Sequence, residues 1–256
     1  MSQFLLPKDR IDWVFLDLDN TLWDFDANAK EALKVLFERH HLQLHTGYQV
    51  DQFISLYEDV NKAYWKRYEK GEVSKEILRT ARFTDTFALM GLAPGLWPEN
   101  VWHEYLEICP LMPLLTPYAI EALSKLSQKF KLGILTNGFE ETQAIKLKES
   151  GIMAFIDFVQ TSESVNDAKP NASFFELALS RVNVQKNNCL YIGDNFNTDV
   201  LGGIHSGILT YHYRYDQDPL ELCPCRTTEW EAEQSFFYGG CIENLLDWAE
   251  KLVDRN

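Results

Sequence analysis

Two aspartates stand at the end of an apolar run near the start of the chain, in the segment VFLDLDNTLW at residues 14–23. The apolar residues of this segment favour a strand that is buried on both faces. Burying a carboxylate is costly unless the group is paired or bound. Asp17 and Asp19 are therefore expected at the exit of the strand, where their carboxylates have something to bind.

The same arrangement recurs twice further along the chain. The segment KLGILTNG places Thr136 and Asn137 directly after apolar residues, and CLYIGDN does so for Asp194. In open α/β sheets, ligands bind at the carboxyl ends of the strands. The sequence therefore predicts that three strands deliver these polar side chains, together with Asp17 and Asp19, to one edge of a sheet.

The residue types at this edge indicate phosphate chemistry. Asp17 with Asp194 offers the hard oxygen ligands that suit Mg²⁺. An aspartate can attack phosphorus and form an aspartyl-phosphate. The hydroxyl of Thr136 and nearby backbone N–H groups can hold phosphoryl oxygens. Lys169, before a proline, could neutralise charge in the transition state, although a lysine taken alone is more often a solvated surface residue.

The elements that position these residues alternate from about residue 117 onward. Strands are expected in KLGILTNG, FIDFVQTSE, CLYIGD and GILTYHY. Helices are expected near 117–129 and in EETQAIKLKESG, KPNASFFELALSRV and CIENLLDWAEKLV. Strands that alternate with helices imply parallel pairing with right-handed crossovers. The predicted fold class is α/β, with a doubly wound parallel sheet.

Residues 24–110 follow a different pattern and contain no convincing strand. Apolar residues recur at helical spacing, as in the stripe formed by Phe53, Leu56, Tyr57 and Val60. This block is therefore predicted to be an all-helical insertion that acts as a cap over the sheet. The predicted domains are a catalytic core of residues 1–22 and 113–256 and a helical cap of residues 23–112.

Four short motifs, in order, resemble those of the haloacid dehalogenase superfamily. They are DLDNT at 17, TNG at 136, KP at 169 and GDNFNTD at 193. The resemblance implies a Rossmann-like core, dependence on Mg²⁺ and phosphate hydrolysis through an aspartate. A single cap between the first two motifs fits the helical-cap subgroup of that superfamily.

The resemblance implies a role for each acidic residue of the motifs. Asp17 would be the nucleophile and a metal ligand. Asp19 would be the general acid/base and would lend its backbone carbonyl to the metal. Asp194 would ligate Mg²⁺, and Asp199 would support the site from the outer shell.

It likewise implies that Thr136 and Asn137 hold the phosphoryl group and that Lys169 orders the nucleophile and the phosphate. Dehalogenases resemble this chain in layout but lack an acid at the position of Asp19, because no leaving oxygen needs a proton. The acid at this position therefore favours a phosphatase, since cleavage of a P–O bond requires proton donation.

The cap suggests a substrate class. Residues 61–83, with TNGF and DVLGGIHSG, are similar to the pyrimidine and house-cleaning 5′-nucleotidase branch of the superfamily. Trp65 and Trp23 are the candidate rings for stacking on a nucleobase. The alternative for rings in this stretch, such as Tyr64 and Tyr68, is that they pack the core of the cap itself. A nucleoside 5′-monophosphate is thus the predicted substrate.

Other readings stay open on the sequence alone. The chain could act on another small metabolite such as a sugar phosphate, as a phosphomutase, or as a 2-haloacid dehalogenase. A binding protein that senses a phosphorylated ligand is the non-enzymatic alternative, although intact Asp17, Asp19, Lys169 and Asp194 argue against it. The exact substrate and the oligomeric state are left undetermined.

Composition limits the partners. The formal net charge of −14 over 256 residues argues against a nucleic-acid polymer or an anionic membrane, and it leaves room for a small phosphorylated metabolite. No apolar run approaches the roughly 18 residues of a membrane helix, and the first ten residues do not resemble a signal peptide. Five cysteines without a CxxC pair favour reduced thiols and a cytoplasmic location. The stretch 213–240, with Cys223 and Cys225, receives no assignment.

Overall fold

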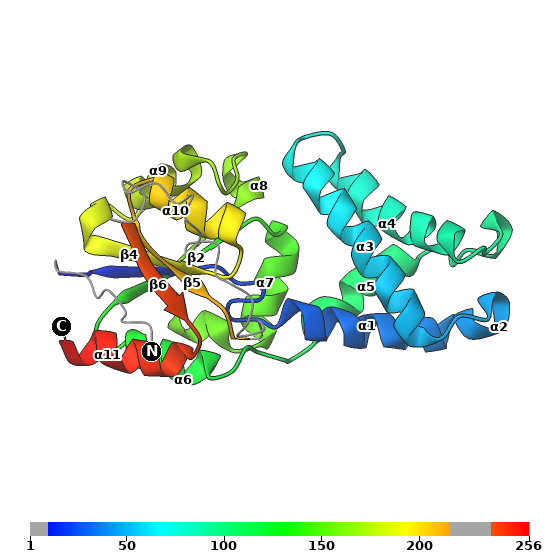
Figure 1. Ribbon diagram of the computed structural model, residues 1–256, viewed down its shortest axis with the longest axis horizontal. Coiled ribbons are helices and arrows are strands. Elements are labelled where there is room, and N and C mark those ends of the chain that lie inside the picture. The colour runs from blue at the N-terminus through cyan, green and yellow to red at the C-terminus, as the bar shows by residue number, and fades with distance from the viewer. Residues whose placement is uncertain (1–9, 216–236, 256) are drawn as a thin grey trace, which may run out of the picture. The chain divides into compact units, whose positions relative to one another are not determined.

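The computed structural model describes residues 10–215 and 237–255 of the chain (Figure 1). Two compact units are present. The first, which we call the core unit, comprises the chain up to Phe25 and the chain from Pro113 onward. The second, which we call the helical unit, comprises Asp26–Met112.

A six-stranded, fully parallel sheet forms the centre of the core unit. Its strands are β1 (Trp13–Leu16), β2 (Lys131–Thr136), β3 (Phe158–Thr161), β4 (Cys189–Gly193), β5 (Leu209–Tyr213) and β6 (Tyr238–Ile242). The spatial order is β3-β2-β1-β4-β5-β6, so the chain leaves β1, builds outward on one side and returns to build on the other. The predicted α/β fold with a doubly wound parallel sheet is confirmed.

Helices cover both faces of this sheet. Those of the core unit are α6 (Ala119–Leu126), α7 (Glu140–Glu149), α8 (Ser162–Val165), α9 (Ala172–Arg181), α10 (Leu201–His205) and α11 (Leu245–Arg255), with a π-helical turn at Phe196–Val200 and short 3₁₀ turns at Ile152–Phe155 and Lys186–Asn188. Helices α6 and α11 pack together on one face, and α9 and α10 pack together on the other (Figure 1). Among the described residues, no helix is both long and apolar enough to cross a bilayer.

The central strands are apolar because helices cover them on both faces. All described side chains of β4 are buried, and those of β1 are buried except for the half-buried Trp13. Aromatic rings fill the space between sheet and helices: Tyr191 packs edge-on against Phe175 at 5.2 Å, and Tyr211 packs against Trp248 at 5.0 Å. Each such ring contributes about 1.5–3 kcal/mol by leaving water. The strand ends are therefore held rigidly in place.

One strand is missing from the sequence-based prediction. The five residues of β6, YGGCI, pair in parallel with β5. Two glycines and the lack of apolar alternation hide this strand, and its last residues, Cys241 and Ile242, fall in the segment CIENLLDWAEKLV that the sequence predicts to be helical. Cys223 and Cys225 lie outside the described residues.

The helical unit contains no strand among its described residues. Its elements are α1 (Phe25–Arg39), α2 (Leu42–Thr46), α3 (Val50–Glu69), α4 (Lys75–Leu89) and α5 (Val101–Ile108), with 3₁₀ turns at Pro94–Leu96 and Cys109–Leu111. Helices α3 and α4 pack against each other, and the hydroxyl of Tyr64 donates to Asp85 at 2.7 Å between them. Tyr64 is buried, as the packing alternative for this ring predicts.

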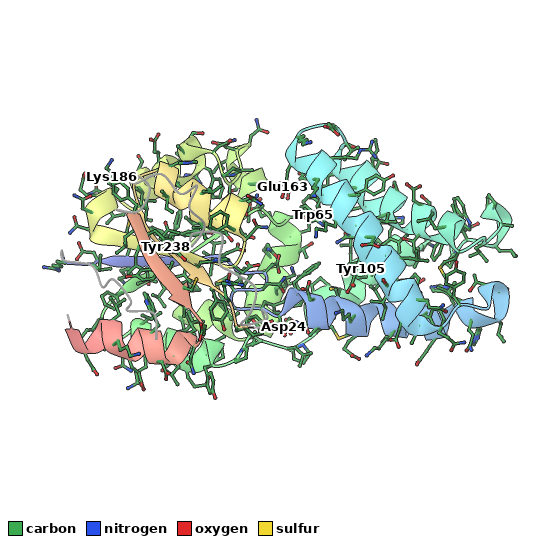
Figure 2. All side chains as sticks on the ribbon, in the orientation of Figure 1. Asp24, Trp65, Tyr105, Glu163, Lys186 and Tyr238 are labelled. Atoms are coloured by element: carbon green, nitrogen blue, oxygen red, sulfur yellow. The ribbon has the colours of Figure 1, made fainter. Side chains whose placement is uncertain are left out.

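A buried arginine lies inside this unit among aromatic rings. The Arg82 guanidinium donates to Asn61 at 2.9 Å and lies 5.0 Å from the ring centre of Tyr105 on α5 (Figure 2). Tyr57 and Phe83 complete its surroundings at 5.8 and 5.5 Å. Ring faces carry negative potential, so they stabilise a desolvated cation. This cluster has a structural role in the helical unit.

Candidate active site

The loop after β1 carries the first aspartates and is fixed at both ends. The backbone N–H of Asp17 donates to the carbonyl of Ile192 at 2.9 Å, which extends the pairing of β1 with β4. The loop then turns back, and the N–H groups of Leu22 and Trp23 both donate to the carbonyl of Leu18 at 2.9 Å. Trp23 also pairs with Leu115. The loop is therefore a rigid platform and not a free connection.

The exits of three neighbouring strands meet at this platform. Leu16 at the end of β1 is in register with Ile134 of β2 and with Ile192 of β4. Thr136 and Asp194 each stand two residues beyond those partners, so both reach the edge at which Asp17 leaves β1. The predicted meeting of strand ends thus follows from the register of the parallel sheet.

The ammonium group of Lys169 lies at the centre of the site. Its Nζ is 2.8 Å from Oδ1 of Asp17, 2.6 Å from Oδ1 of Asp199 and 3.0 Å from the hydroxyl of Tyr191. Lys169 is only 3% exposed. An ammonium has three N–H donors, and each has an acceptor here. Lys169 is thus a buried, fully paired cation and not a solvated surface lysine.

Asp199 supports the site from behind. Its Oδ1 accepts from Lys169 and from the Tyr191 hydroxyl at 2.8 Å, and its Oδ2 accepts from the backbone N–H of Asn195 at 3.0 Å. A Cβ on Gly193 would stand 2.4 Å from the Asp199 carboxylate, so only glycine permits this approach. Both Asp199 oxygens are therefore committed to the protein.

Burial and crowding shift the ionisation of these groups. Burial, with further contributions from Asp199 and Asp19, raises the pKa of Asp17 to about 7 against the opposing effect of Lys169. Burial and the neighbouring Asp199 and Asp17 also raise the pKa of Asp194 well above its usual value. Burial alone would lower the pKa of Lys169, but the two adjacent carboxylates outweigh it and raise that pKa. The site thus holds more negative charge than Lys169 can balance.

The donor set fits a divalent cation. Carboxylate oxygens of Asp17, Asp194 and Asp199 lie within 4.8 Å of one another. Because both oxygens of Asp199 already accept hydrogen bonds, Asp17 and Asp194 are the two carboxylates able to contact a metal directly. An ion there would offset the repulsion that raises their pKa values, and oxygen ligands suit Mg²⁺.

Asp194 is held by two further contacts. The hydroxyl of Thr21 donates to its Oδ1 at 3.2 Å. The Nε2 of His212 lies 2.8 Å from its backbone carbonyl, and burial lowers the pKa of His212. A neutral imidazole in this position carries its proton on Nε2, because a carbonyl only accepts. The turn after β4 is thereby tied to both β1 and β5.

Thr136 is placed to donate a hydrogen bond. Its Oγ1 accepts from the N–H of Gly138 at 3.1 Å and from Nε2 of Gln143 at 2.8 Å. With both lone pairs engaged, the hydroxyl proton points elsewhere, and it has no acceptor among the described residues. That proton is suited to a phosphoryl oxygen.

The side chain of Asn137 is engaged with the loop that carries Lys169. Its Oδ1 accepts from the backbone N–H of Lys169 at 2.9 Å, and its Nδ2 donates to the backbone carbonyl of Lys169 at 3.0 Å. Both ends of the amide are thus occupied by one residue. Asn137 fixes the loop that carries Lys169, and its side chain is not positioned to hold a phosphoryl group.

Asp19 points away from the carboxylate cluster. Its Oδ1 lies 2.6 Å from the ammonium of Lys146, and its Oδ2 accepts from Nε2 of Gln143 at 2.9 Å. Both partners belong to α7. The structure therefore separates the two aspartates of the first motif, with Asp17 facing Lys169 and Asp19 facing α7.

The two tryptophans proposed for base stacking differ in exposure. Trp23 is fully buried, and the Lys146 ammonium lies 4.3 Å from its ring centre. Trp23 therefore has no exposed face for a base, and the structure does not support that prediction. Trp65 on α3 is half-buried and meets Tyr68 edge-on at 5.8 Å (Figure 2).

Sequence reasoning missed four residues of the site, namely Thr21, Gln143, Lys146 and Tyr191. Gln143 and Lys146 stand three apart on a predicted helix, and both are buried together with Leu147. A glutamine and a lysine on the inward face of a helix that follows a site-bearing strand were a usable signal. Tyr191 lies inside an apolar strand, and such a pattern predicts a packing role for the ring and no role for the hydroxyl.

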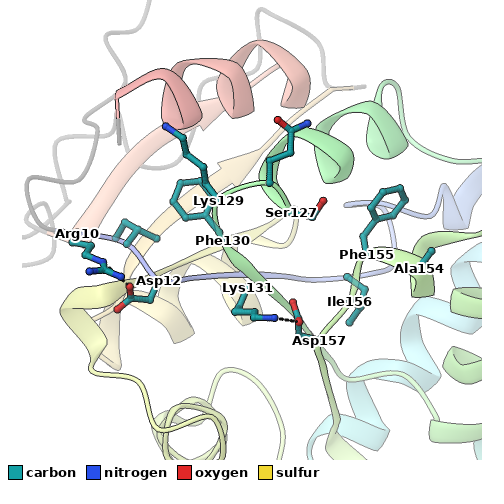
Figure 3. Close-up of a pocket in the computed structure, with 12 residues that line it drawn as sticks. Arg10, Asp12, Ser127, Lys129, Phe130, Lys131, Ala154, Phe155, Ile156 and Asp157 are labelled. Carbon is teal, nitrogen blue, oxygen red and sulfur yellow. Dashed lines mark hydrogen bonds and ion pairs between the residues drawn. The ribbon is translucent and has the colours of Figure 1, made fainter.

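A separate cavity of about 960 Å³ opens at the opposite edge of the sheet (Figure 3). It lies at the amino ends of β1 and β2, and four of its charged side chains form two ion pairs. Arg10 contacts Asp12 at 2.9 Å, and Lys131 contacts Asp157 at 2.6 Å. None of the predicted site residues lines this cavity.

Similarity to known proteins agrees with this arrangement. Residues 11–207 match the family model described as haloacid dehalogenase-like hydrolase. Pyrimidine 5′-nucleotidase YjjG of Escherichia coli (strain K12) is 32% identical over 221 residues, which cover 84% of this chain and 92% of YjjG. Pyrimidine 5′-nucleotidase PynA of Streptococcus pneumoniae (strain ATCC BAA-255 / R6) is 29% identical over 204 residues, covering 78% of this chain and 83% of PynA.

Among solved structures, the HAD-hydrolase YfnB of Bacillus subtilis bound to magnesium aligns with a TM-score of 0.77 at 25% identity, covering 95% of this chain and 99% of YfnB. The parallel sheet that gathers carboxylates and a buried lysine at one edge agrees with this family match. The chain belongs to the haloacid dehalogenase-like hydrolases, and it is an enzyme.

The environment of Lys169 generates a testable prediction. Tyr191→Phe removes the hydroxyl that accepts from Lys169 and donates to Asp199. A buried charged donor then lacks an acceptor, which costs about 1–3 kcal/mol and lowers Tm by about 2–4 °C per kcal/mol. Thermal unfolding by circular dichroism measures the change.

Tyr213→Phe is the matched control, because Tyr213 is equally buried on β5 and its hydroxyl donates to Pro117 at 3.5 Å. A Tyr191→Phe protein with the Tm and the turnover of the wild type would show that this hydroxyl does not support Lys169.

Proposed function

We propose that this enzyme is a Mg²⁺-dependent phosphomonoesterase that acts through an aspartyl-phosphate on Asp17. The observation that carries the proposal is the cluster at the sheet edge, where Asp17 and Asp194 can share a cation while Lys169 contacts Asp17 at 2.8 Å. An aspartate next to a cation and an ammonium group can attack the phosphorus of a phosphate ester and form a covalent intermediate. When bound, Mg²⁺ would neutralise charge on the phosphoryl oxygens next to Asp17.

The residues divide the reaction into two displacements. In the first, a carboxylate oxygen of Asp17 attacks phosphorus and the P–O bond to the alcohol breaks, with Asp19 giving its proton to the leaving oxygen. In the second, Asp19 removes a proton from water, and the resulting hydroxide attacks phosphorus and releases phosphate from Asp17. Thr136 would donate to a phosphoryl oxygen, and Lys169 would balance the charge of Asp17 and of the transferred group.

We further propose a nucleoside 5′-monophosphate as the substrate and a cytoplasmic location. Two relatives at about 30% identity are named pyrimidine 5′-nucleotidases, which supports a nucleotide over other phosphate esters. The buried thiols of Cys189 and Cys241 are compatible with a reducing compartment. Small phosphorylated metabolites are the proposed partners.

A substrate screen tests this proposal directly. Purified protein is assayed for phosphate release from pyrimidine and purine nucleoside monophosphates and from sugar phosphates, and for halide release from 2-haloacids, each with Mg²⁺ or with excess chelator. We expect the highest kcat/KM for a nucleoside monophosphate and activity only with Mg²⁺. A higher kcat/KM for a sugar phosphate would contradict the proposed substrate. Halide release would contradict the proposed reaction and indicate a dehalogenase. Binding of esters without turnover would indicate a protein that senses a phosphorylated ligand.

The role of Asp17 predicts a second result. Asp17→Asn keeps the shape of the side chain but removes the attacking charge and one metal ligand, so turnover should fall by about a thousandfold or more. Wild-type turnover by a contaminant-free preparation of this variant would contradict the mechanism.

Metal binding has its own readout in thermal stability. Because the pKa of folded Asp17 is raised from 3.8 to about 7, this group favours folding at low pH and loses that contribution as the pH rises toward 7. Mg²⁺ binds the ionised form. It should therefore raise the Tm of the wild type more at pH 8 than at pH 5, and raise that of Asp17→Asn much less at either pH.

The proposed nucleotide specificity predicts a result for Trp65. If its ring stacks on a base, Trp65→Ala should lower kcat/KM for a nucleoside monophosphate by about ten- to a hundredfold. Phenyl phosphate has no base, so its turnover should change little. Trp102→Ala is a matched control, since Trp102 is a half-buried tryptophan on α5 of the same unit. Equal losses with both substrates, together with a lower Tm, would show that Trp65 only packs the helical unit.

A further inference from the structure

Helix α7 turns two polar side chains inward beside the active site. Gln143 is 1% exposed and Lys146 is 3% exposed, and they stand three residues apart on one helical face. Neither belongs to the four motifs that carry the family resemblance. An ammonium removed from water is costly unless it is paired, so the position of Lys146 requires a physical reason.

That reason is the carboxylate of Asp19. Lys146 Nζ lies 2.6 Å from Oδ1, and Gln143 Nε2 lies 2.9 Å from Oδ2. Each carboxylate oxygen thus receives one donor, and two donors from one rigid helix fix both the direction and the plane of the carboxylate. A side chain that is otherwise 28% exposed is held in one orientation.

The amide of Gln143 also joins Asp19 to Thr136. Its second N–H donates to Oγ1 of Thr136 at 2.8 Å. The NH₂ end of the amide therefore faces both Asp19 and Thr136, and the buried Oε1 has no partner among the described residues. One side chain therefore sets both the expected acid/base and the hydroxyl that is suited to the phosphoryl group.

Two aromatic rings and one glycine adjoin the side chains of Lys146 and Gln143. The Lys146 ammonium lies 4.3 Å from the ring centre of Trp23 and 5.3 Å from that of Phe25, and both ring faces stabilise a cation. A Cβ on Gly138 would stand 2.2 Å from Nε2 of Gln143. Glycine at this position leaves room for the amide to reach Asp19 and Thr136.

We propose that Gln143 and Lys146 are positioning residues that hold the Asp19 carboxylate for proton transfer at the leaving oxygen. The inference rests on the proposed function, in which Asp19 is the general acid/base. A general acid must come within about 2.6–3.2 Å of the atom it protonates, and a displacement of about 1 Å can cost about a hundredfold in rate. Without the two donors, Asp19 would be distributed over several rotamers.

The test compares variants of α7 in the full chain, with and without Asp19. Lys146→Met removes the charge at similar length, Lys146→Arg keeps the charge, and Gln143→Met removes the amide. Lys148→Met is the matched control, because Lys148 lies on the same helix with its side chain 80% exposed and forms an ion pair with the neighbouring Glu149 at 3.1 Å. Each is made in the wild type and in Asp19→Asn, and its Tm is recorded.

The readout is the release of alcohol in single turnovers with excess enzyme, for phenyl phosphate and for 4-nitrophenyl phosphate. Phenol needs a proton as it leaves, whereas 4-nitrophenolate needs much less help. We expect Lys146→Met and Gln143→Met to slow phenyl phosphate by about ten- to a hundredfold and to slow the nitrophenyl ester less. Lys146→Met should leave the enzyme concentration that gives half the maximal rate nearly unchanged, because the contact with Thr136 belongs to Gln143. Lys146→Arg should recover part of the loss, and Lys148→Met should match the wild type.

The Asp19→Asn background separates positioning from packing. With no acid left to position, Lys146→Met should cause little further loss, and Gln143→Met should cause only the loss that comes through its contact with Thr136, whereas a packing defect would multiply with the loss from Asp19→Asn. Multiplicative losses for Lys146→Met, equal losses for both esters with Lys146→Met, or a faster Lys146→Met enzyme would each overturn the inference. Should Lys146→Met fail to fold, Gln143→Met and Lys146→Arg carry the same comparison.

Failure of the proposed function gives a different pattern. A wild type inactive on both esters, or an Asp19→Asn variant with undiminished rates, would overturn the function and this inference with it. An active wild type with an impaired Asp19→Asn and a normal Gln143→Met and Lys146→Met would overturn the positioning role alone.

Discussion

The contacts of the buried Lys169 ammonium are the interaction on which the rest of the candidate site depends. The ammonium lies between Asp17 at the exit of β1 and Asp199 in the turn after β4, and the Tyr191 hydroxyl accepts its third N–H. Charges removed from water are tolerated only when every donor and acceptor is satisfied. The bare backbone of Gly193 and the reciprocal bonds of Asn137 with the Lys169 backbone both serve this requirement.

The need to balance buried charges applies to the whole site and not only to Lys169. When all are ionised, the carboxylates of Asp17, Asp19, Asp194 and Asp199 face two buried ammonium groups, those of Lys146 and Lys169. Two negative charges remain on this count, and they lie on the Asp17 side of the site, since Lys146 contacts Asp19. Burial raises the pKa values of Asp17 and Asp194, and the neighbouring carboxylates add to the rise. The two excess negative charges equal the charge of one divalent cation, which is why we favour Mg²⁺ for this cluster of oxygen donors.

The sequence predicted the site correctly where a polar residue directly follows an apolar strand. Asp17, Thr136 and Asp194 each follow an apolar strand, and parallel register alone brings them together. It was less informative where the answer depends on the direction of a side chain. Asn137 stands beside Thr136 in the same motif, yet its amide binds the Lys169 backbone, and Trp23 is fully buried with its ring against the Lys146 ammonium. The short strand β6 could not be predicted, because YGGCI has neither alternating apolar and polar residues nor a continuous apolar run.

The inward face of α7 shows why the four sequence motifs do not include every residue that shapes the site. A strand exit can place a carboxylate at the sheet edge, but it cannot fix the last torsion angles of a half-exposed side chain such as Asp19. A second element must supply donors, and a helix that begins after the adjacent strand is close enough to do so. Gln143 and Lys146 occupy buried positions that usually hold apolar residues, and their burial forgoes hydrophobic stabilisation. Such a loss is reasonable where orientation of a reacting group matters more than stability, because catalysis is far more sensitive than folding to a shift of about 1 Å.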